Sequence, residues 1–206
     1  MKLKKIIAIS TIALGLALVP VTAHASIFSW FDNASLNIES AVKGLPLTIS
    51  TYDNEGQKID QIKTKSANIH TDKEMSNYDG DGNQKSSVID IDYGDNRITH
   101  VGSTMIAYEG LVNYKDKYAK DHNLEDFDSS TPIINSMYQN FKNNWDSSSK
   151  VVVIRSQAGN PVAAFVGNHV SINQTEMKNT TKFTIDDHRL IAYRCDYTVY
   201  PMDSLK

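Results

Sequence analysis

The sequence predicts an α+β domain: a mostly antiparallel sheet with two or three helices inserted between two groups of strands. Three observations lead to this prediction. Strand-like segments with polar and apolar residues in alternation occur before residue 102 and after residue 150. Segments with helical spacing of apolar residues lie between them, and clusters of Gly, Asp and Asn separate the strands.

The first 25 residues have the three parts of a signal peptide. Three lysines in MKLKK precede an apolar run (6–19), and Ala23-His24-Ala25 forms a cleavage motif. A membrane anchor is the competing hypothesis, but a spanning helix needs about 20 apolar residues and Pro20 interrupts this run. We therefore expect cleavage near Ala25-Ser26, secretion of residues 26–206 as a single globular domain, and no stable membrane insertion after cleavage.

Charge and cysteine content narrow the class of partner. The first 25 residues hold three of the 21 basic residues and no acidic residue, so 18 basic and 24 acidic residues remain, a formal charge of −6. This sign disfavours nucleic acid as a partner, because nucleic acid requires a cationic face. Cys195 is the only cysteine. No intramolecular disulfide can form, so the fold must depend on its hydrophobic core.

The elements before residue 102 follow from local pattern. Apolar residues spaced by three and four predict a short amphipathic helix, or an ordered arm, over residues 26–42. A strand over 45–53 and a second strand over 57–70 are joined by the turn DNEG and predict a hairpin. A polar loop follows over 71–87. SVIDIDYG and RITHV, separated by a turn at Gly94, predict a second hairpin.

The remaining elements are two helices and a last group of strands. We predict a helix over 103–127, bent near Gly110, and a second helix that begins at Thr131 and Pro132 and carries an apolar face to Trp145. KVVVIRSQ, VAAFVG and KFTID predict three strands, with a polar link before the third. RLIAYRCDYTVY predicts one continuous final strand (189–200).

Four segments carry a resemblance to a known family: LTISTYDNEGQKIDQI, HVGSTMIAYEGLVNY, VVVIRSQAGNPVAAFVG and LIAYRCDYTVY. Together they resemble a family of small exported proteins from Gram-positive bacteria that is a domain of unknown function. The resemblance covers roughly residues 36–200. It implies a Gram-positive exporter and assigns no catalytic residue.

The candidate binding residues are His100, Ser103 and Thr104. A strand that passes through Gly102 into a helix would present free backbone N–H groups to a phosphate, sulfate or carboxylate. Two alternatives remain open. Ser103 or Thr104 simply caps the helix while His100 occupies a strand position, which is the interpretation we favour. In the other, Ser103 and His100 form the nucleophile and base of a hydrolase, although no G-x-S-x-G elbow surrounds Ser103.

A calcium loop is a weaker hypothesis. Asp79, Asp81 and Asn83 resemble the first three ligand positions of such a loop. Gln84 stands where the loop needs a glycine, so we favour a flexible turn. The sequence therefore predicts no metal site and no cofactor.

Two further groups invite a chemical hypothesis. Asp90 and Asp92 share one face of a predicted strand and have the residue types of a glycosidase acid and base, but we favour a solvent-exposed face. Cys195 is expected to be buried, and Arg194 with Asp196 to form a surface pair.

These observations favour a secreted protein that acts by binding, without catalysis, at the cell envelope or outside the cell. Its expected partner is an envelope or extracellular protein. The alternatives are an extracellular hydrolase that acts on wall or extracellular substrate, and a partner or inhibitor of another exported protein.

Overall fold

The computed structural model describes residues 35–39, 46–82, 87–122, 137, 141, 144–175 and 177–205. The predicted signal peptide lies outside these residues. In the described part of the chain, no helix is long and apolar enough to cross a membrane.

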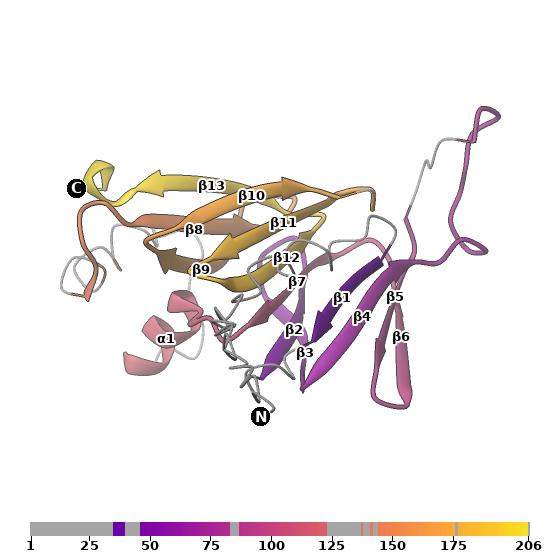
Figure 1. The fold of residues 1–206 in the computed structure, drawn as a ribbon, viewed down its shortest axis with the longest axis horizontal. Coiled ribbons are helices and arrows are strands. Elements are labelled where there is room, and N and C mark those ends of the chain that lie inside the picture. The colour runs from indigo at the N-terminus through magenta and orange to yellow at the C-terminus, as the bar shows by residue number, and fades with distance from the viewer. Residues whose placement is uncertain are drawn as a thin grey trace, which may run out of the picture.

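The chain forms three antiparallel sheets (Figure 1). The four-stranded sheet has the order β1-β4-β5-β6, with β1 (Ser35–Glu39), β4 (Ser66–Thr71), β5 (Ile89–Tyr93) and β6 (Asn96–His100). The six-stranded sheet has the order β10-β11-β12-β7-β2-β3, with β2 (Leu47–Tyr52), β3 (Lys58–Thr64), β7 (Thr104–Glu109), β10 (Val170–Gln174), β11 (Thr180–Ile185) and β12 (His188–Tyr193). The three-stranded sheet has the order β13-β8-β9, with β8 (Lys150–Arg155), β9 (Pro161–Gly167) and β13 (Asp196–Pro201).

The α+β prediction is wrong, because the described chain is mostly strand with one α-helix, α1 (Tyr114–Asp121), and a 3-10 turn, η2 (Met202–Ser204). The error begins at the helix predicted over 103–127. Its first part is β7, every residue of which is buried. A strand that is covered on both faces loses the polar and apolar alternation by which strands are recognised.

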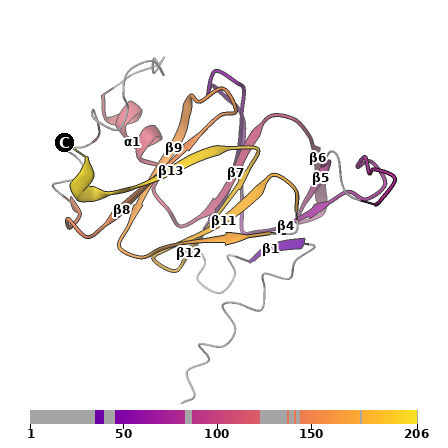
Figure 2. The ribbon, with the colours of Figure 1, turned by 90° about the horizontal axis from the view of Figure 1, so that it is seen from above.

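The six-stranded sheet is the middle layer and has a core on each face. Along β7, Met105 and Ala107 pack toward the four-stranded sheet, while Ile106 and Tyr108 pack toward the three-stranded sheet. This split follows from the two-residue period of a strand. Figure 2 shows β8, β9 and β13 toward one side of the molecule and β4, β5 and β6 toward the other.

A third core lies on the far face of the three-stranded sheet. Val151 and Val153 of β8 pack there against Met137 and Phe141. Helix α1 contacts β9 on the same side (Figure 1). Most of the helix predicted from Thr131 lies outside the described residues, but Met137 and Phe141 are helical and buried.

Both predicted hairpins are confirmed, as β2–β3 and β5–β6. Four other predictions are wrong. The strand predicted over 57–70 is β3 and β4, which belong to different sheets, and the polar link contains β10. The single strand predicted over 189–200 is β12 and β13, again in different sheets. Within 26–42, predicted as a helix or an ordered arm, the structure describes β1, a strand paired with β4, so the helix alternative is wrong for these residues.

Candidate ligand-binding site

The chain turns a corner at Arg194. Only Arg194 and Cys195 connect β12 to β13, and Arg194 has a φ of 51°, a left-handed conformation that costs a non-glycine residue about 1–2 kcal/mol. Its backbone N–H donates to the carbonyl of Asn179 (2.8 Å), and its own carbonyl accepts from Thr104 Oγ1 (2.9 Å). Its Nη2 donates to Oε1 of Gln157 (3.2 Å). Strained positions held by several contacts in this way concentrate at functional sites.

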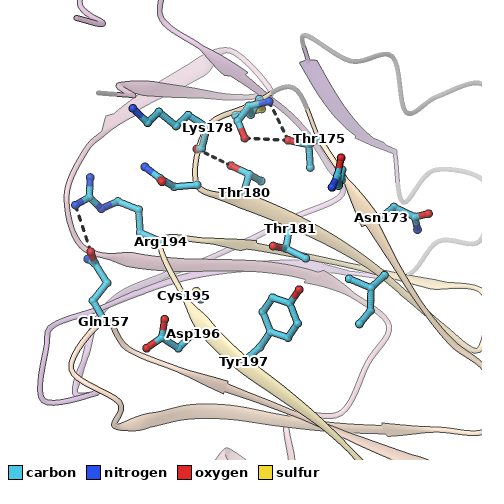
Figure 3. A pocket seen from close by; sticks show the side chains of 14 residues that line it. Gln157, Asn173, Thr175, Lys178, Thr180, Thr181, Arg194, Cys195, Asp196 and Tyr197 are labelled. Atoms are coloured by element: carbon cyan, nitrogen blue, oxygen red, sulfur yellow. Dashed lines mark hydrogen bonds between the residues drawn. The ribbon is translucent and has the colours of Figure 1, made fainter. Parts of the chain in front are cut away.

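A pocket of about 730 Å³ opens beside this corner, between the six-stranded and three-stranded sheets (Figure 3). Elsewhere between these two sheets, the same space is filled by the apolar side chains of the core. On β11, Thr181 lies on the same face as Phe183, which is buried in that core. Gln174 of β10 is paired with Thr181 and also lines the pocket. Core-facing positions therefore become polar where the pocket begins.

Among the described residues that line the pocket, Tyr197 of β13 is the one with an aromatic side chain. It is 39% exposed, and its ring packs edge-on against Phe183, with ring centroids 4.9 Å apart and planes at 88°. Ile172 of β10 is 47% exposed on the same lining. The core thus fixes the orientation of a ring that remains accessible from the pocket.

Cys195 also lines the pocket but lacks the environment of a nucleophile. Its thiol is half-buried and donates to the carbonyls of Tyr193 (3.2 Å) and Met105 (3.5 Å). Burial raises the pKa of the Cys195 thiol well above its usual range. A thiol that stays protonated is a poor nucleophile.

A second pocket, of about 640 Å³, lies on the other side of Arg194 and Gln157, which line both pockets. The turn after β2 and the link between β6 and β7 supply its other walls, including Glu55 and Ser103. The Gln157 side chain makes two hydrogen bonds here: its Nε2 donates to the carbonyl of Gly102 (3.0 Å), and its Oε1 accepts from Arg194. Gln157 and Arg194 therefore form a polar ridge between two hollows.

The residues predicted from sequence lie beside this second pocket. No helix begins at Ser103, because Thr104 is the first residue of β7, so the expected helix N-terminus is wrong. His100 Nε2 lies 3.0 Å from the backbone carbonyl of Ser103, and the ring packs edge-on against Tyr193. Burial lowers the pKa of His100, which favours the neutral imidazole.

This geometry does not form the predicted nucleophile and base, because the His100 ring contacts the backbone carbonyl of Ser103 and not its hydroxyl. Thr104 is buried and its hydroxyl donates to Arg194. Ser103 lines the second pocket. A ligand role for these three residues stays a prediction.

Asp90 and Asp92 belong to an ion-pair network on the four-stranded sheet. Asp90 is 3% exposed, so the solvent-exposed face predicted for it is wrong. Its carboxylate accepts from Thr99 Oγ1 (2.7 Å) and lies 3.3 Å from Arg97 Nη1. Asp92 binds Arg97 Nε (2.6 Å) and His70 Nε2 (3.0 Å), and the Arg97 hydrogen bond lowers the pKa of Asp92. The lowered pKa keeps Asp92 a carboxylate, which does not suit a general acid.

Asp79 and Asp81 lie in a turn, where Asp79 Oδ1 accepts from the backbone N–H of Asp81 (3.0 Å). Asn83, the third residue of the calcium hypothesis, lies outside the described residues. Within the described ranges, no three His, Cys, Asp or Glu side chains are grouped as metal ligands.

The comparisons with known proteins place the chain in a family. A family model described as a domain of unknown function, DUF5052, matches residues 4–205. The chain belongs to the DUF5052 family. The comparison with curated proteins found no match, and neither did the comparison with solved structures. The expected membership of a family of unknown function is thus confirmed, and the chemistry of this DUF5052 chain must be argued from its pockets.

The sequence did not indicate the residues that line the larger pocket of this DUF5052 protein. Arg194 was expected to pair with Asp196, yet its side chain donates to Gln157. Thr181 and Gln174 carried a weak signal, since they are polar residues at core-facing strand positions. That signal appears only when the face of each strand is known.

Proposed function

We propose that the chain is an exported protein that binds a ligand in the two pockets joined at Arg194 and Gln157, and that it acts without catalysis. The observation that carries this proposal is the state of Arg194. It is held in a left-handed conformation on the ridge between the pockets, and its buried Nε has no hydrogen-bond partner among the described residues. A buried donor without a partner is costly, and a ligand oxygen would satisfy it.

Binding fits the larger pocket better than hydrolysis does. Among the described residues that line this pocket, Asp196 is the one that carries a carboxylate. Glycoside hydrolysis ordinarily requires two carboxylates. The Cys195 thiol is kept protonated by burial. The lining instead combines amide, hydroxyl, guanidinium and aromatic groups, which fix the orientation of a bound molecule.

Export is supported by the amino end of the chain. Its lysines, apolar run and Ala23-His24-Ala25 motif have the order of a signal peptide. The producer would be a Gram-positive bacterium by the resemblance, and the site of action would be the cell envelope or the medium.

The test begins with the full 206-residue chain, expressed in a Gram-positive host that exports proteins. We expect the protein in the medium with Ser26 as its first residue, which N-terminal sequencing would establish. Uncleaved protein retained inside the cells would contradict the export part of the proposal.

The binding part is tested by co-sedimentation of the exported protein with purified cell-envelope material. Arg194→Gly removes the guanidinium from the ridge and should lower retention at least about tenfold, which corresponds to about 1.4 kcal/mol. Asp187→Gly is the matched control, because Asp187 also has a left-handed φ (66°) but lies outside both pocket linings. Equal retention of the two variants would overturn the assignment of the site, and turnover of envelope material by the wild type would favour the hydrolase.

A further inference from the structure

The larger pocket presents an uncommon combination of groups. Most of its polar lining is uncharged and consists of amide and hydroxyl groups: Asn173, Gln174, Thr175, Asn179, Thr180 and Thr181. The hydroxyls of Thr175 and Thr180 already donate to the backbone carbonyls of Met177 and Lys178. Figure 3 shows several of these side chains around the space between β11 and β13. Such a lining matches a molecule that carries many hydroxyl groups, since each hydroxyl is itself both a donor and an acceptor.

One donor at this pocket has no acceptor. In the described part of the chain, three buried side-chain nitrogen atoms have no hydrogen-bond partner, and one of them, Arg194 Nε, belongs to the corner beside the pocket, whereas Asn173 Nδ2 lies on the other face of the sheet, because Asn173 pairs with Lys182. Buried polar groups in folded proteins are almost always paired. An acceptor oxygen of a ligand, such as a hydroxyl or ring oxygen of a sugar, would satisfy the Arg194 donor.

Tyr197 supplies an apolar platform among these polar groups. Its accessible ring is held edge-on by Phe183, so its orientation is set before any ligand arrives. The face of an aromatic ring is electron-rich and packs well against the C–H groups that cover one face of a sugar ring. Ile172, 47% exposed, extends the apolar contact area.

The charges of the lining do not select an ion. The lining carries two cationic side chains, Lys178 and Arg194, and one carboxylate, Asp196. A site for an anionic polymer would need a stripe of cations, and a site for a metal would need a group of carboxylates. Neither is present in the described lining.

We propose that the larger pocket binds a neutral oligosaccharide, with Tyr197 against one sugar ring and with Arg194 as a donor to its oxygens. This inference rests on the proposed function and names its ligand class. A volume of about 730 Å³ is that of a small-molecule site, and the second pocket continues beyond Arg194 and Gln157. A chain of several sugars, longer than the first pocket, therefore crosses the ridge.

The test is a calorimetric titration of the exported protein, produced from the full-length chain, with neutral N-acetylglucosamine and glucose oligomers of one to six units. An oligogalacturonate serves as the charged arm and a tetrapeptide as the peptide arm. We expect saturable binding of a neutral series that strengthens with length, and less than about twofold change in affinity between low and high salt, since no ligand charge is screened. Binding of the charged or peptide arm alone would overturn the proposal.

Variants of the pocket residues test whether the ligand binds in this pocket. Tyr197→Phe keeps the ring and should retain affinity within about threefold, while Tyr197→Leu should lose at least about tenfold. If Tyr197→Leu fails to fold, Arg194→Gly provides the same test, with Asp187→Gly as its control. Unchanged affinity in a folded Tyr197→Leu or Arg194→Gly protein would overturn the assignment.

The two proposals fail in different ways. If Arg194→Gly abolishes envelope retention but no neutral oligosaccharide binds the wild type, the carbohydrate inference is wrong and the binding function stands. If neither envelope material nor any oligosaccharide binds the folded wild type, both are wrong.

Discussion

Arg194 Nη2 donates to Gln157 Oε1 over 3.2 Å, and the two side chains that make this contact line both pockets. Gln157 comes from the turn between β8 and β9, and Arg194 from the corner between β12 and β13. This hydrogen bond thus links two connecting segments of the chain, and the two side chains form the ridge between the two pockets. Replacement of either residue is therefore expected to alter binding in both pockets.

The left-handed backbone of Arg194 makes a prediction about stability that is separate from binding. Glycine adopts a positive φ without the steric cost that any other L-residue bears. The free energy of unfolding of Arg194→Gly should therefore be about 1 kcal/mol higher than that of Arg194→Ala, although both variants lack the guanidinium. Urea denaturation of the two variants measures the difference, and equal midpoints would show that the corner is not strained.

Asp90 is predicted to stabilise the fold. Asp90→Ala removes the acceptor of Thr99 and the buried partner of Arg97, so the free energy of unfolding should fall by about 1–3 kcal/mol. Asp95→Ala, in the exposed turn between β5 and β6, should change it by less than about 0.5 kcal/mol. If the urea midpoints of the two variants agree, the Asp90 network contributes no stability.

His100 predicts a dependence of stability on pH. Burial lowers its pKa in the folded state below the ordinary value of about 6.5, so protons bind more tightly to the unfolded chain. The stability that this residue contributes is complete above about pH 6.5 and is lost as the pH falls through the folded-state pKa. The urea midpoint of the wild type should decline from pH 7 to pH 5.

The control for this prediction is a pair of histidine variants. His100→Gln should flatten the decline between pH 7 and pH 5, whereas His169→Gln, which removes a side chain that is 94% exposed, should leave it unchanged. An identical decline in all three proteins would assign the pH dependence to other groups.

Gly167 is predicted to tolerate no side chain. A Cβ at this position would lie 2.5 Å from Ile185 Cγ2 and 2.9 Å from Asp186 Oδ2, so Gly167→Ala should destabilise the protein by about 1–3 kcal/mol. Gly80→Ala is the control, since no atom lies within 4 Å of its Cβ position. Thermal unfolding compares the two, and an unchanged melting temperature for Gly167→Ala would contradict the close packing of β9 on the turn after β11.

Glu109 and Arg189 form an ion pair on adjacent strands of the six-stranded sheet, with side chains 5% and 15% exposed. Arg189→Met leaves a buried carboxylate without this partner and should cost about 3–5 kcal/mol. The double variant Glu109→Leu/Arg189→Met should recover most of that loss, because no charge remains buried. Additive losses in the double variant would show that the two side chains are not coupled.

Local pattern was sufficient for the hairpins and for the choice of core faces on β5. Ile89 and Ile91 alternate with Asp90 and Asp92, and the two isoleucines enter the core as the alternation requires. The turn before β6 contains Gly94, with a φ of 55°. Such features depend on neighbours in the chain, so the sequence alone determined them.

The tertiary structure decided which strands share a sheet and where the pockets lie. β7 resembled a helix in sequence because two other layers cover it, and β12 and β13 resembled one strand because nothing local marks a corner at Arg194. The pocket requires Thr181 of β11 to meet Tyr197 of β13 and Arg194 of the corner before β13. That meeting depends on contacts between residues distant in the chain, for which alternation and turn propensity carry no information.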